Sequence, residues 1–134
     1  MSFYFFYSLM PWTMLLLRIA IGSIFVVHGL PKLKNPGQMG AGIGMSSGMV
    51  TVIGLVETIG AVAVIIGLLT PLGALGLAVI MAGAIYYKTQ KWHVPFTAMD
   101  KMGWEFDLIL LAAALLLMTT GAGPLSVDAV LGWW

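Results

Sequence analysis

Four long apolar stretches, separated by short polar or glycine-rich connections, make up most of the chain. They cover about residues 12–30, 49–69, 72–87 and 104–120. Each approaches the ~20 apolar residues, at ~1.5 Å per residue, that a helix needs to cross the hydrocarbon core of a bilayer. The pattern predicts an all-α fold, a membrane-embedded four-helix bundle that forms a single transmembrane domain over residues 1–134.

Proline and glycine mark the ends of these stretches. Pro11 suits the first turn of the first helix, and Pro31 predicts its end. Only residues 70–71 separate the second and third stretches, so these helices are expected to be antiparallel neighbours. The run 121–124 stops the fourth helix, after which Ser126 is placed to cap a short terminal helix.

The lysines predict the orientation of the chain in the membrane. The connections after the first and third stretches hold Lys32, Lys34, Lys88, Lys91 and Lys101, whereas the other connections hold no Lys or Arg. Cytoplasmic loops of membrane proteins are enriched in these residues. We therefore expect the lysine-bearing loops to be cytoplasmic and both the N- and C-termini to lie on the outer side.

Composition supports a membrane protein and narrows its chemistry. The chain is 60% hydrophobic and 8% charged, whereas a soluble domain is about 25% charged. A net charge of +1 excludes the basic stripe of a nucleic-acid binder. Cys is absent, and the ten Met residues lack a His cluster, so flexible packing is favoured over a metal site. No ligand set for a metal or a flavin is evident.

Two ionisable residues interrupt the apolar stretches most deeply. Glu57 shares its helix face with Gly54, Gly60 and Ala61, small residues that let another helix approach, so Glu57 is expected to point into protein. Arg18 is expected to reach towards Glu57 from the first helix. Two interpretations are open: the pair only fixes helix packing, or its carboxylate handles protons or orients a polar ligand head.

A second group of polar residues lies within about two turns of the predicted cytoplasmic surface. It comprises His28, Tyr86, Tyr87, Glu105 and Asp107. These side chains either exchange protons with a quinone-like headgroup or are simply solvated at the interface. The candidate catalytic residues are thus Glu57 and His28. The candidate ligand-binding residues are Arg18, Glu57, His28, Tyr86, Glu105 and Asp107.

The glycine-rich run 37–48 could suggest a phosphate cradle. No strand precedes it, however, and no Gly-Lys-Ser/Thr closes it. A flexible lid or a re-entrant turn is the better interpretation.

Three segments together resemble the DoxX family of small four-helix membrane proteins. They are LLRIAIGSIFVVHGLPKLKN (16–35), GLVETIGAVAVIIGLLTPLGAL (54–75) and WEFDLILLAAALLLMTTGAGPLSVD (104–128). The resemblance implies a multi-pass protein in the cytoplasmic (inner) membrane of a bacterium or archaeon. The family is named for a subunit related to the DoxD part of an archaeal thiosulfate:quinone oxidoreductase. Its recurring polar positions would correspond here to Arg18, His28 with Gly29, Lys32, Glu57 and Asp128.

Three functional hypotheses follow. The leading one is a redox-associated subunit that binds a quinone or lipid-like ligand between its helices and receives electrons from a membrane or peripheral redox partner. The alternative is a non-catalytic accessory or assembly subunit of a larger membrane complex. A transporter or channel is the third, and it would require a homo-oligomer because four helices offer little material for alternating access.

Overall fold

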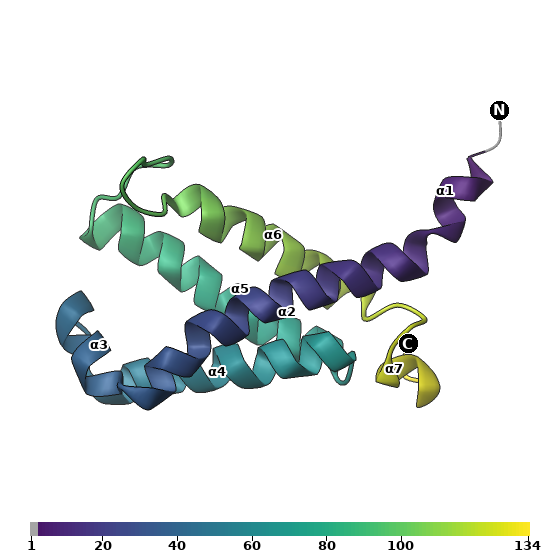
Figure 1. The fold of residues 1–134 in the computed structure, drawn as a ribbon, viewed down its shortest axis with the longest axis horizontal. Helices are drawn as coiled ribbons and strands as arrows, with labels where there is room; N and C mark the ends of the chain where they lie inside the picture. The colour runs from purple at the N-terminus through teal and green to yellow at the C-terminus, as the bar shows by residue number, and fades with distance from the viewer. Residues whose placement is uncertain (1–2) are drawn as a thin grey trace.

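The computed structural model describes residues 3–134, which form helices joined by turns and one longer loop (Figure 1). No strand occurs among these residues, so the predicted all-α class is confirmed. The elements in chain order are α1 (Tyr4–Ser8), α2 (Met10–Lys34), α3 (Pro36–Ile43), α4 (Ser47–Ile66), α5 (Thr70–Tyr86), the π-helical turn η1 (Tyr87–Lys91), α6 (Trp104–Thr120) and α7 (Val127–Val130).

Three helical segments within residues 3–134 are long and apolar enough to cross a membrane. They are Met10–Lys34, Ser47–Ile66 and the continuous segment Thr70–Lys91. Helix α6 is shorter, with 17 residues. The chain is therefore an all-helical protein suited to a bilayer, and a fourth crossing by α6 stays a prediction.

The long helices form two antiparallel pairs, α2 with α4 and α5 with α6 (Figure 1). The tight turn between α4 and α5 joins the pairs, which diverge from there towards the end where α3 lies. Both chain ends lie at the α4–α5 turn end of the molecule, although their side of the membrane stays a prediction. The buried apolar core lies where the pairs converge, and includes Ile21, Phe25, Val64, Leu77 and Leu117.

Glycines set the closest helix contacts. A Cβ added at Gly54 of α4 would lie 3.1 Å from the carbonyl oxygen of Gly29 on α2, and one at Gly60 would lie 3.1 Å from that of Gly73 on α5. Small residues are what allow two helix backbones to approach this closely. The predicted packing role of the small residues around Glu57 and the antiparallel contact of the second and third helices are both confirmed.

The prediction that Pro31 ends the first helix is wrong. Helix α2 continues to Lys34, and the Asn35 N–H still donates to the Pro31 carbonyl at 3.0 Å. A proline has no N–H to donate, and its ring clashes with the carbonyl group four residues earlier. The helical turn that follows the proline can still form. Lys32 therefore stays on the helix instead of entering a loop.

The glycine-rich run is also more regular than expected. Most of it belongs to α3, which packs beside α4. Gly44 then adopts the left-handed conformation, with φ at 74°, and the hydroxyl of Ser46 caps α4 by accepting the Met49 N–H at 3.2 Å. A helix and a tight turn therefore form where a flexible lid was one expectation, and a re-entrant position in the membrane stays a prediction.

Candidate functional site

A cavity of about 420 Å³ lies between the two helix pairs, towards the lysine-bearing end. Helices α2, α4, α5 and α6 and the turn η1 line it, and Ile43 and Met45 contribute from the segment around α3. Its walls are mostly apolar, with a few charged side chains. This volume and mixture are typical of small-molecule sites, which measure ~300–1,000 Å³.

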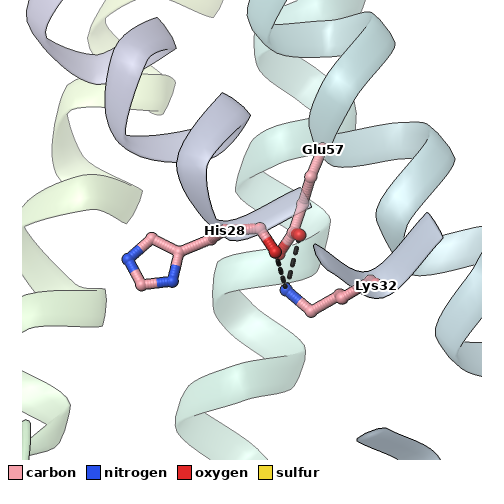
Figure 2. A network of polar contacts seen from close by, with 3 residues as sticks. All are labelled: His28, Lys32 and Glu57. Atoms are coloured by element: carbon pink, nitrogen blue, oxygen red, sulfur yellow. Dashed lines mark hydrogen bonds and ion pairs between the residues drawn. The ribbon is translucent and has the colours of Figure 1, made fainter. Parts of the chain in front are cut away.

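One ion pair lies on the wall formed by α2 and α4 (Figure 2). Lys32 Nζ lies 2.5 Å from Glu57 Oε2 and also donates to the His28 carbonyl oxygen at 3.2 Å. Glu57 is only 3% exposed. Lys32 follows His28 by one turn and lies on the α2 face that meets α4, where Gly29 and Gly54 bring the backbones together.

A second ion pair lies on the wall formed by η1 and α6. Lys88 Nζ lies 2.6 Å from Asp107 Oδ2, and Asp107 is buried. The two groups attract as charges but are not aligned as a hydrogen bond, and Oδ2 accepts no hydrogen bond within the described part of the chain. Oδ2 is fully buried and its charge is balanced by the Lys88 ammonium, so it is the ion pair as a whole that borders the cavity.

The expected pair between Arg18 and Glu57 does not exist. Glu57 lies opposite Gly29, so the antiparallel packing of α2 and α4 separates it from Arg18 by about ten residues, or ~15 Å along the helices. Arg18 instead donates to four backbone carbonyl oxygens at 2.7–2.9 Å, those of Val64, Ile65, Ala122 and Leu125. The carbonyls of Val64 and Ile65 belong to the C-terminal turn of α4, a position that attracts cations.

Asp128 completes a second polar cluster around Arg18, which we call the clasp and define by Arg18, Gly67 and Asp128. The Asp128 carboxylate accepts the N–H groups of Leu69 at 2.7 Å and Thr70 at 3.0 Å. Gly67 ends α4 with φ at 72°, and a Cβ there would lie 2.6 Å from Arg18 Nη2. The clasp therefore ties α2, the α4–α5 turn and the C-terminal segment together, away from the cavity.

The capping role predicted for Ser126 is confirmed beside the clasp. Its hydroxyl accepts the Ala129 N–H at 3.1 Å and starts α7. This short helix holds Asp128 in position.

The structure separates the other predicted site residues. The His28 side chain lines the cavity, but Figure 2 shows its ring turned away from the ion pair, and it lies 6.1 Å from the Phe106 ring on α6. Tyr86 and Glu105 are exposed and do not line the cavity, whereas Tyr87 does. Of the six candidate ligand-binding residues, the cavity thus brings together His28, Glu57 and Asp107.

Sequence reasoning missed the roles of Lys32 and Lys88 in the site. Both were used as markers of the cytoplasmic side, and the family resemblance added Lys32 as a recurring polar position without assigning it a partner. A signal was present for Lys88, because it lies at nearly the same predicted membrane depth as Asp107, whereas the predicted helix end at Pro31 placed Lys32 in a loop. Within residues 3–134, no group of three or more His, Asp or Glu side chains is arranged to hold a metal ion.

Comparison with known proteins identifies the family. The DoxX family model matches residues 13–90, more than half of the chain. This chain belongs to the DoxX family. The resemblance drawn from the three sequence segments is thereby confirmed.

Three relatives of this DoxX-family chain are informative. A Bacillus subtilis protein named "Putative oxidoreductase CatD" is 38% identical over 85% of this chain and 83% of its own length. An uncharacterised protein of Haemophilus influenzae is 31% identical over 88% of this chain and 90% of its own length. An uncharacterised membrane protein of Mycobacterium tuberculosis is 28% identical, over 88% and 80% respectively. No solved structure matches significantly.

The DoxX match covers part of each polar cluster. Arg18, Lys32, Glu57 and Lys88 lie within residues 13–90, whereas Asp107 and Asp128 lie beyond them. The Lys32–Glu57 pair therefore lies wholly in the region that defines the family. The α6 side of the cavity is supplied by the remaining part of the chain.

Proposed function

We propose that the protein binds a quinone in the cavity between its helix pairs and serves as a subunit of a membrane redox system. In this proposal it crosses the cytoplasmic membrane of a bacterium or archaeon four times, with both termini outside. The observation that carries the proposal is an apolar cavity containing the two ion pairs Lys32–Glu57 and Lys88–Asp107.

The chemistry of the ion pairs suits both redox forms of a quinone. An oxidised quinone presents carbonyl oxygens that accept hydrogen bonds, and the reduced form presents hydroxyl groups that donate them. A lysine is a donor only, and an ionised carboxylate is an acceptor only, so each pair offers one group for each form. The apolar walls then accommodate the ring and the start of its tail.

His28 is the proposed proton-transfer group. Its imidazole borders the cavity and has one ring nitrogen that donates and one that accepts, so it is placed to pass a proton between the headgroup and the aqueous side. Arg18, proposed from sequence as a ligand contact, has no such position.

The redox assignment draws on the relative from Bacillus subtilis, whose name describes it as an oxidoreductase. In the proposed scheme electrons reach the bound quinone from a membrane or peripheral redox partner, because this chain has no Cys for a thiol relay. The protein would thus supply the quinone site and the partner would supply the electron donor.

The test is to purify the protein in mild detergent and to identify co-purifying quinone by mass spectrometry. Glu57→Gln should lose the quinone, because an uncharged amide no longer balances Lys32. Glu105→Gln is the matched control, since it makes the same chemical change at an exposed carboxylate, and it should retain the quinone.

Absence of quinone from the wild type, together with wild-type electron transfer in Glu57→Gln membranes, would contradict the proposal. A stable stoichiometric complex with a larger membrane protein, unaffected by Glu57→Gln, would instead support the accessory or assembly role.

A further inference from the structure

A second, shallower hollow adjoins the cavity on the side of α2 and α6. It has a volume of about 260 Å³ and is lined by Ser23, Ile24, Val27, His28 and Phe106. Helices α2 and α6 pack against each other much less than α2 packs against α4. The hollow therefore occupies a gap in the helix packing on the flank of the molecule.

The cavity and this hollow share one partition. Ile24, His28 and Phe106 line both of them. The His28 and Phe106 rings lie 6.1 Å apart, as a tilted pair from facing helices. Both side chains are only partly buried, so each has the room that a rotamer change requires. Movement of these two rings would join the hollow to the cavity.

The outer rim of the hollow is suited to lipid and not to water. Val27 is 69% exposed, and Ser23 lies one turn earlier on the same face. Both lie in the middle of α2, a helix long and apolar enough to cross a membrane. In a bilayer this opening faces acyl chains.

We propose that the hollow between α2 and α6 is a lateral portal, through which the apolar tail of the cavity ligand passes between the bilayer and the cavity, with His28 and Phe106 as its gate. This inference rests on the proposed function, since it concerns the same cavity and ligand. Its occupant is the tail of a membrane-dissolved amphiphile, which explains why the hollow is mainly apolar and adjoins the cavity.

The portal predicts a kinetic effect without a change in affinity. Ser23 and Val27 line the hollow but not the cavity. Bulky side chains at these positions should raise the barrier to entry and to exit equally, because the bound state does not contact them. Entry and exit rates should both fall by the same factor, on the order of tenfold, at unchanged Kd.

The experiment uses the full chain in phospholipid vesicles, with decylubiquinone as the probe. Binding is followed by stopped-flow quenching of tryptophan fluorescence, because Trp92 lines the cavity. The test variant is Ser23→Phe combined with Val27→Phe, which adds bulk but no fluorophore. The matched control is Ile109→Phe, on a side chain of α6 that is 64% exposed and lines neither space.

The double variant should slow decylubiquinone exchange at constant Kd, and Ile109→Phe should match the wild type. A tail-less benzoquinone should exchange at the wild-type rate in every variant, because it does not need the lateral opening. Wild-type exchange of decylubiquinone in the double variant would overturn the portal and leave the quinone site standing.

The failure of the proposed function has a different signature. Quenching by a doxyl-labelled phospholipid but not by decylubiquinone, slowed by the double variant, would keep the portal and replace quinone with lipid as its cargo. Quenching by neither probe would overturn both the portal and the quinone site.

Discussion

The two ends of the molecule both bury charges, but they satisfy them in different ways. In the clasp, Arg18 is 1% exposed and all four of its hydrogen bonds go to backbone carbonyls. In the cavity, the charges pair side chain to side chain and border a space of about 420 Å³. One region uses its charge to fix the backbone, and the other places paired charges in the wall of a cavity.

This difference shows that depth in an apolar helix does not by itself identify a functional residue. Intramembrane charges are often functional, yet Arg18 gives four of its five N–H donors to backbone carbonyls and has little left to offer a ligand. The Lys32 ammonium is the contrasting case, because it has three donors and makes two hydrogen bonds, to the His28 carbonyl oxygen and to the Glu57 carboxylate. The spare hydrogen-bonding capacity of a group is therefore more informative than its burial.

The largest expected effect comes from removing the clasp cation. Arg18→Met leaves four carbonyl oxygens without their donor, and hydrogen bonds from charged groups contribute about 1.5–3 kcal/mol each. We expect the free energy of unfolding to fall by at least about 3 kcal/mol. Thermal unfolding of the purified protein in detergent measures this loss.

Arg18→Lys is the informative companion, because an ammonium keeps the charge but not the planar arrangement of donors. It should fall between the wild type and Arg18→Met in stability. Quinone content per folded molecule should stay unchanged in both. A variant of wild-type stability that has lost its quinone would move Arg18 from the clasp to the binding site.

A smaller effect on stability is expected at the Lys32–Glu57 pair. Glu57→Met or Lys32→Met alone leaves one charge facing an apolar wall, at a cost of about 1–3 kcal/mol. Substituting both by Met removes the unpaired charge, so stability should return to near the wild-type value. Quinone binding should be lost in all three variants, because the polar recognition group is gone.

Unfolding curves and quinone content, measured on the same four proteins, test this prediction. Recovery of stability without recovery of binding would separate the role of the pair in the ligand site from its role in the fold. If the double Met variant bound quinone as the wild type does, the pair would be a packing element like the clasp.

Much of the fold was predictable because it depends on periodic and compositional signals. Apolar length predicted the long helices, and the tight 70–71 connection predicted the contact of α4 with α5. Small residues around Glu57 predicted which α4 face is buried. Such signals are local in sequence, so one chain is enough to show them.

The partners of Arg18 and Glu57 could not be predicted in this way. Which residues meet across two helices depends on their axial register, and a shift of seven residues moves a contact by ~10 Å. Pro31 added to the error, because treating it as a helix end placed Lys32 in a loop. The acceptors of Arg18 were harder still to foresee, since backbone carbonyls have no sequence signature.

The smallest expected effect distinguishes the two walls of the cavity. Asp107→Asn keeps an oxygen acceptor and the side-chain shape, but it removes the charge opposite Lys88, so stability should fall by only about 1 kcal/mol. Affinity for reduced decylubiquinone should fall more than affinity for the oxidised form, because the hydroquinone is the donor that needs this carboxylate.

Asp100→Asn, at an exposed position outside the cavity, is the control and should change neither quantity. Titration of each variant with both redox forms gives the two dissociation constants. Equal weakening of both forms would show that the η1–α6 wall holds the ring by charge balance alone, and that Lys32–Glu57 is the pair that distinguishes the redox states.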